Sequence, residues 1–147
     1  MRALLFAAAA CAAAPAAAQL APVAAFESVR AFPLTPGAWT YRATAEGSES
    51  GFAGVLRIRC DKAVRQISLQ RLGVAPTPGV ALPPLLVATD SLARSLPGAG
   101  ASLGPFDPLL DAIAFSRGRF VVTGGGGGML VVPAWPEAAR SIENCRN

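Results

Sequence analysis

The sequence Phe52-Ala-Gly-Val-Leu-Arg-Ile-Arg-Cys60 carries the clearest strand pattern in this chain of 147 residues. Apolar residues at positions 56, 58 and 60 alternate with arginines at 57 and 59, the period of two typical of a half-buried strand. Asp61-Lys62-Ala63 predicts a turn, and residues 64–72 predict a return strand with Ile67 and Leu69 inward. Apolar side chains buried on one face of the sheet and arginines in water on the other face indicate an antiparallel sheet.

Working outward, residues 39–44, 85–89, 119–123 and 129–132 also predict strands. The stretch from Glu46 to Gly51 predicts a turn, and residues 75–84 and 97–105 predict loops rich in glycine and proline. The stretch from Asp90 to Leu96 fits either a short helix capped by Asp90 or a strand and turn, and we favour the strand and turn.

Two short helices are predicted in the C-terminal half. Asp107-Pro108 is an acidic cap followed by proline at the first helical position, and Gly118 is placed to end the helix. Pro136 begins the last helix, in which Trp135, Ala139, Ile142 and Cys145 fall near one face. The fold class is therefore α+β and mostly β: a small antiparallel β-sandwich or half-open barrel with two short helices.

The first 18 residues predict a signal peptide, with Arg2, an apolar run and small residues before a cleavage point after Ala18. The run is shorter than the roughly 20 apolar residues that an anchor needs. A lipoprotein acylated at Cys11 is the alternative. We expect residues 19–36 to form an irregular lead-in and residues 37–147 to form a single β-rich domain.

Removal of the signal peptide takes away one of the three cysteines and leaves Cys60 and Cys145. In an oxidising compartment we expect these two to form a disulfide that ties the last helix to the sheet. The predicted location is the periplasm of a Gram-negative bacterium or the medium, with no transmembrane segment in the mature chain.

The charge and residue content argue against several classes of function. The net charge of +4 falls to +3 without Arg2, and the arginines are scattered, so we expect no nucleic-acid partner. The absence of histidine removes Ser-His and Cys-His nucleophile pairs and imidazole metal ligands. We predict no catalytic residue, no metal and no cofactor.

One polar and aromatic cluster is a candidate binding patch: Arg117, Arg119 and Trp135. These residues are suited to an anion or peptide groove, because arginine and tryptophan are enriched at contact hot spots. The alternative is two solvated arginines and a core tryptophan. Gly124–Gly128 joins two predicted strands and contains no lysine, so we interpret it as a flexible hairpin tip rather than a phosphate-binding loop.

Three segments carry a resemblance to a known group of proteins: residues 107–120, residues 130–137 and Glu143-Asn-Cys-Arg146, with a weaker match at residues 56–60. They resemble a family of uncharacterised exported proteins from alphaproteobacteria, which has no assigned activity. The resemblance implies a small β-rich periplasmic domain with paired cysteines. In size, export and β content the chain is also loosely similar to the invasion-associated locus B proteins.

We therefore expect a non-enzymatic binding or accessory module for another periplasmic protein or a cell-envelope component. A carboxylate-dependent hydrolase of envelope polymers is one alternative, and it requires two acidic side chains that converge in a cleft. An inhibitor of a secreted enzyme is another, and it requires one rigid protruding loop.

Overall fold

The computed structural model describes residues 22–147, with side chains from Phe26 onward. The predicted signal peptide and Cys11 lie outside these residues. Two antiparallel sheets form the fold, with strand orders β1-β2-β3-β4-β7 and β6-β5-β8-β9. The strands are β1 (Trp39–Thr44), β2 (Gly47–Phe52), β3 (Leu56–Asp61), β4 (Gln66–Arg71), β5 (Leu85–Ala88), β6 (Ala93–Leu96), β7 (Gly100–Leu103), β8 (Arg119–Gly124) and β9 (Gly127–Pro133).

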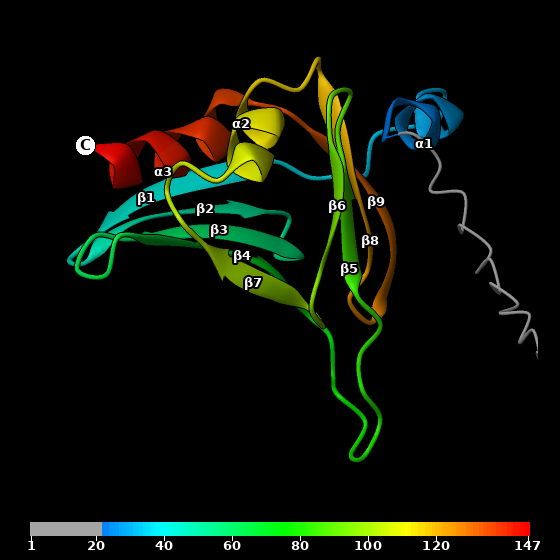
Figure 1. The fold of residues 1–147 in the computed structure, drawn as a ribbon, viewed down its shortest axis with the longest axis horizontal. Coiled ribbons are helices and arrows are strands. Elements are labelled where there is room, and N and C mark those ends of the chain that lie inside the picture. The colour runs from blue at the N-terminus through cyan, green and yellow to red at the C-terminus, as the bar shows by residue number, and fades with distance from the viewer. Residues whose placement is uncertain (1–21) are drawn as a thin grey trace, which may run out of the picture.

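Three short helices accompany the sheets: α1 (Pro22–Val29), α2 (Pro108–Ala114) and α3 (Pro136–Arg146). Figure 1 shows α2 and α3 over one face of the five-stranded sheet, with the four-stranded sheet standing steeply against it. The sheets do not close into a barrel. The predicted fold class, α+β and mostly β with two short helices in the C-terminal half, is confirmed.

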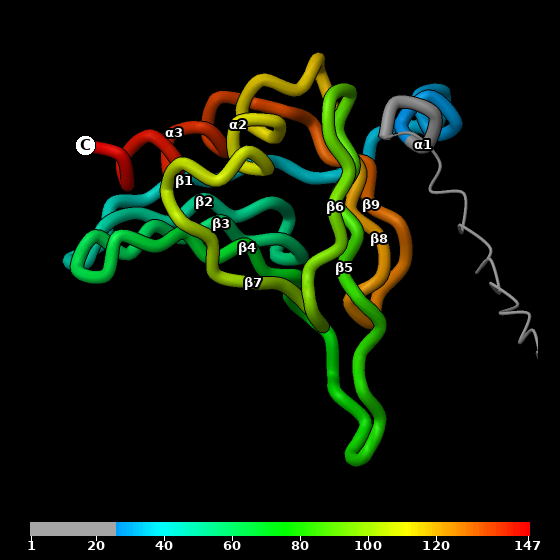
Figure 2. Tube along the Cα trace, in the orientation of Figure 1, coloured from blue at the N-terminus to red at the C-terminus, as the bar shows by residue number. Residues whose placement is uncertain are grey.

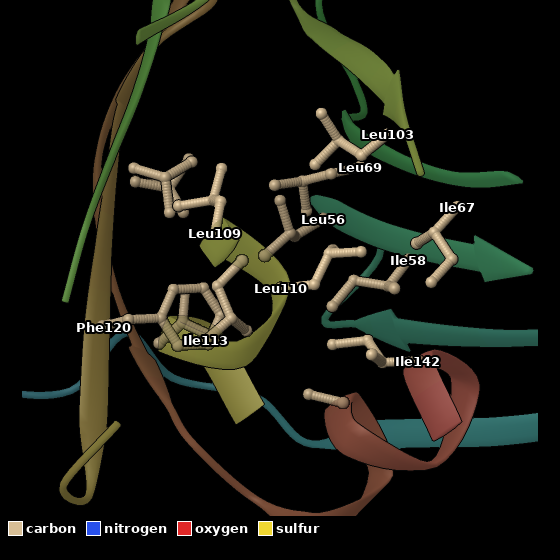
Figure 3. Close-up of a cluster of buried hydrophobic side chains, with 14 of the residues drawn as sticks. Leu56, Ile58, Ile67, Leu69, Leu103, Leu109, Leu110, Ile113, Phe120 and Ile142 are labelled. Atoms are coloured by element: carbon tan, nitrogen blue, oxygen red, sulfur yellow. The ribbon is translucent and has the colours of Figure 1, made fainter. Parts of the chain in front are cut away.

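The core lies where α2 enters the angle between the two sheets. Leu109, Leu110 and Ile113 of α2 are fully buried. Figure 3 shows them between Phe120 of the four-stranded sheet and Leu56 of the five-stranded sheet. Asp107 caps this helix as predicted, because its carboxylate accepts a hydrogen bond from the backbone N–H of Leu109 at 2.9 Å.

The predicted turn at Glu46–Gly51 is wrong, because residues 47–52 form strand β2. Glycine and serine are uncommon in strands and common in turns, which misled the sequence interpretation. The strand nevertheless fits here because α3 packs directly on it. The Ser50 hydroxyl is buried, donates to the backbone oxygen of Glu137, and lies 2.7 Å from the Ser141 hydroxyl. Small side chains on β2 therefore let the helix approach.

Replacing Ser50 by valine is expected to lower the free energy of unfolding by about 2 kcal/mol, because Ser141 loses its partner and the larger side chain crowds α3. Urea unfolding followed by circular dichroism measures the change. Ser95→Val is the matched control, since Ser95 is an exposed strand serine, and it should change stability by less than about 0.5 kcal/mol. Equal effects of the two substitutions would contradict close packing at β2.

One predicted loop contains a strand, and the stretch that the sequence left ambiguous is a turn and a strand. The predicted loop at residues 97–105 contains the short strand β7, which pairs with β4. The ambiguous stretch from Asp90 to Leu96 ends in strand β6, so the favoured strand and turn is confirmed over the helix. The chain therefore crosses between the sheets three times: between β4 and β5, between β6 and β7, and between β7 and β8 through α2.

The predicted irregular lead-in at residues 19–36 is wrong in part, since it contains helix α1. Proline is favoured in the first helical turn, which suits a start at Pro22. The helix lies on the side of the four-stranded sheet away from α2 and α3 (Figure 1). Phe26 is buried there, and the Arg119 guanidinium donates to the backbone oxygens of Arg30 and Phe32. These contacts come from distant parts of the chain and leave no local sequence signal.

The disulfide between Cys60 and Cys145 is present, with the two Cα atoms 5.4 Å apart. It joins β3 to α3, as the sequence predicts. The buried stripe of α3 differs from the prediction, because it consists of Ala138, Ser141, Ile142 and Cys145. Trp135 precedes this stripe and has 45% of its surface exposed, so it is not a core tryptophan.

Candidate functional site

The three residues of the predicted binding patch come from adjacent segments but face different partners. The backbone N–H of Ala134 donates to the oxygen of Gly118 at 3.2 Å, which brings the two segments together. The Arg117 side chain is 92% exposed and lies 3.6 Å from the Asp90 carboxylate. The Arg119 guanidinium instead holds the segment after α1, at 3.1 Å from the Arg30 oxygen and 2.8 Å from the Phe32 oxygen. A binding role for this patch stays a prediction.

A hollow of about 360 Å³ lies beside Arg117, and Glu27, Arg30, Asp90 and Ser91 help to line it. Its charges are balanced in pairs, since Arg30 lies 3.4 Å from Glu27 and Arg117 lies 3.6 Å from Asp90. A site whose charges neutralise each other gives no preference for an anion or a cation.

The four aspartates of the chain also have separate partners. Asp90, Asp107 and Asp111 form ion pairs with arginines 117, 94 and 146. The Asp61 carboxylate accepts hydrogen bonds from the backbone of its own turn. The hydrolase alternative requires two acidic side chains in one cleft, and these contacts give it no support.

The most prominent surface feature is the loop of residues 73–84, which we call the projecting loop. Figure 2 shows it extending well beyond both sheets, between β4 and β5. At its tip the N–H of Val80 donates to the oxygen of Thr77 at 3.0 Å. Pro78 and Gly79, with a φ of +76° at Gly79, fit the two central positions of a type II turn.

The composition of the projecting loop makes it stiff and apolar. It contains four prolines and no charged residue in the sequence Gly73-Val-Ala-Pro-Thr-Pro-Gly-Val-Ala-Leu-Pro-Pro84. Each proline fixes its φ angle and removes a backbone donor, so the two arms have fewer conformations to lose on binding. Residues 75–81 are all exposed, and Val80 at the tip has 62% of its surface in solvent.

The base of the projecting loop rests on the turn between β8 and β9, residues 124–127, which we call the glycine turn. The N–H of Gly125 donates to the backbone oxygens of Pro83 and Pro84, at 3.1 and 3.3 Å. A Cβ atom at Gly124 would overlap the Pro84 oxygen, and one at Gly126 would overlap Val74. The glycine turn therefore contacts both arms of the projecting loop.

The glycines are therefore not the free hairpin tip that the sequence suggested. Their missing side chains make room for Val74, Leu82 and the residues around Pro84, so the turn supports the base of the projecting loop. A run of glycines does not by itself distinguish a free tip from a packed one. The distinction depends on which segment lies above it, and that segment is about 40 residues away in the sequence.

The comparisons with known proteins add no relative. No protein-family model matches the chain, no curated protein matches it, and no solved structure matches it. Function is therefore inferred from the chain's own geometry.

Between residues 22 and 147, no helix is long and apolar enough to cross a membrane. In the same range, no three acidic or cysteine side chains gather in a way that would hold a metal ion.

Proposed function

We propose that this protein is exported and acts as a non-enzymatic binding module that contacts another extracytoplasmic protein through the projecting loop. The observation that carries the proposal is the loop itself: a stiff, uncharged, proline-rich segment that is exposed along residues 75–81 and held at its base by the glycine turn. The disulfide between Cys60 and Cys145 supports export to an oxidising compartment.

Preorganisation of the projecting loop favours binding through it. A flexible loop loses conformational entropy when it binds, and a loop already fixed by prolines and a packed base loses less. Val80 offers an apolar side chain with no charge to desolvate. The surface of the partner that fits this loop is therefore a recessed apolar cleft. A projecting loop buries most of its own surface area when it enters a concave site.

The test compares two exposed valines. Val80→Arg places a charge at the tip of the projecting loop, whereas Val64→Arg places one in the β3–β4 turn, and the two valines are 62% and 61% exposed. Tagged proteins with each change are used to capture partners from periplasm or culture medium by chemical crosslinking. We expect Val80→Arg to lose a partner that the wild type and Val64→Arg both retain. Identical sets of crosslinked proteins from all three would refute the proposal.

A second candidate function is inhibition of a secreted enzyme, and the same loop favours it. A single rigid projecting segment is the feature that this alternative requires, and such a segment is able to enter an active-site cleft. The test adds purified protein to secreted hydrolases of the same organism. Inhibition by the wild type and Val64→Arg, but not by Val80→Arg, would show that the partner is an enzyme.

A further inference from the structure

Arg71 is the last residue of β4 and continues its inward row, after Ile67 and Leu69. It is 9% exposed, so a guanidinium occupies the end of the core where the projecting loop begins. The side chain reaches across to the four-stranded sheet, because a Cβ at Gly127 would overlap its Nε and Cζ atoms. Arg71 thus lies between the two sheets, beside the glycine turn.

The charge of Arg71 is not balanced by its surroundings. Arg71 is the only Asp, Glu, Lys or Arg within residues 66–86, 95–106 and 120–136, which include the projecting loop and the glycine turn. Seven other arginines lie within ion-pair distance of a carboxylate: 30, 42, 57, 59, 94, 117 and 146. Within residues 22–147, no carboxylate lies that close to Arg71.

The hydrogen bonding of Arg71 is also incomplete. Its Nη1 donates to the backbone oxygen of Gly124 at 3.3 Å, which is long for such a bond. A guanidinium has five N–H donors, so most of its capacity is left for another acceptor. Burial lowers the pKa of Arg71 below its usual value by removing water from the charged form. No Arg71 nitrogen is among the buried side-chain atoms that lack a hydrogen-bond partner, so its unbonded N–H groups are open to solvent and to an anion.

An anion has room to reach this place. Arg71 lines a hollow of about 500 Å³ together with Gln70 and residues 99–102 of the turn and strand β7. Gln70 and Ser102 alternate with the inward residues of β4 and β7, so their side chains lie on the outer side of the sheet, where the Gln70 amide oxygen accepts a hydrogen bond from Arg57. The hollow is open to solvent and lies next to the start of the projecting loop, so a protein that covers the loop down to its base also covers the hollow.

We propose that Arg71 is an anion-binding residue and that its ligand is a carboxylate of the protein that docks on the projecting loop. The carboxylate fits because a guanidinium binds it with two parallel charge-assisted hydrogen bonds. This inference rests on the proposed function for the source of the carboxylate, but the anion site itself is a property of the isolated chain.

The first test needs no partner. The full mature protein is titrated with sodium acetate, and the Nε–Hε signals of its arginines are followed by NMR, with sodium chloride at equal ionic strength as the reference. We expect a saturable shift of the Arg71 signal, with a dissociation constant on the order of millimolar, and a linear drift for Arg59. Absence of a saturable acetate shift at Arg71 in the wild type would overturn the site, whether or not variants fold.

The second test identifies the source of the anion. Arg71→Gln is compared with Arg59→Gln for binding to the partner captured through Val80. We expect Arg71→Gln to weaken binding by about 30-fold or more, because the carboxylate of the partner is left buried and unpaired. Acetate binding without any loss of partner affinity would mean that the site takes free small anions instead. If acetate binds at Arg71 and no partner depends on Val80, the proposed function fails while the anion site stands.

Discussion

Replacing both Cys60 and Cys145 by alanine is expected to lower the free energy of unfolding by about 4.5 kcal/mol, a large part of the total for a domain of this size. The disulfide spans 85 residues. A link across so long a loop removes many conformations from the unfolded chain, and this is the main source of the expected effect. The figure is an upper value because unfolded chains retain some structure.

The same substitution should loosen one helix more than the rest of the fold. α3 packs on β1, β2 and β3, and its buried stripe ends at Cys145. Without the covalent link, the last turns of α3 are held by Ile142 and by the ion pair between Arg146 and Asp111 at 2.7 Å. Hydrogen exchange should therefore rise first in residues near the C-terminus.

Urea unfolding of the oxidised protein, the reduced protein and the double variant tests this prediction. The reduced protein and the double variant should unfold at similar urea concentrations, both well below the oxidised protein. Added reductant is the control, because it should not change the double variant. Equal midpoints for the oxidised and reduced wild type would show that the link contributes nothing to stability.

Local patterns predicted the parts of the fold in which local chemistry decides the structure. The alternation over residues 56–60 led to β3, and Asp107-Pro108 gave the start of α2. The same periodicity placed the two cysteines on inward faces, and their pairing was expected because they are the only two left after removal of the predicted signal peptide. In each case the neighbours in sequence already carry the information.

The missed elements depend on distant partners. Strand β2 has the composition of a turn, and it is a strand because α3 requires small residues beneath it. The segment that follows helix α1 is held by Arg119, nearly 90 residues away. β7 has four residues and pairs with β4 after the chain has crossed to the other sheet and returned. Such contacts are set by tertiary packing, which overrides local propensity.

The candidate site likewise contains features that the sequence predicted and features that it did not. Prolines predicted a loop at residues 75–84, but not that it projects beyond both sheets. The inward position of Arg71 could have been predicted from the sequence, because Arg71 continues the inward row of Ile67 and Leu69. An arginine at an inward position breaks the expected pattern, and breaks of this kind are expected at functional sites.

A series of three glycine substitutions tests whether the base of the projecting loop is packed. Gly128→Ala should change stability by less than about 0.5 kcal/mol, because a Cβ there meets nothing within 4 Å. Gly79→Ala should cost about 1 kcal/mol, since Gly79 has a φ of +76° in open space. Gly124→Ala should cost about 3 kcal/mol or more, because a φ of +79° is combined with overlap on the Pro84 oxygen.

The three variants separate backbone strain from packing. Gly79→Ala and Gly124→Ala impose similar strain, so the difference between them measures the contact of the glycine turn with the projecting loop. Urea unfolding gives the stabilities, and limited proteolysis of the folded proteins should show faster cleavage within residues 73–84 in Gly124→Ala. If Gly124→Ala costs no more than Gly79→Ala and leaves cleavage unchanged, the glycine turn does not hold the loop. The projecting loop would then lose the rigidity on which its role in binding depends.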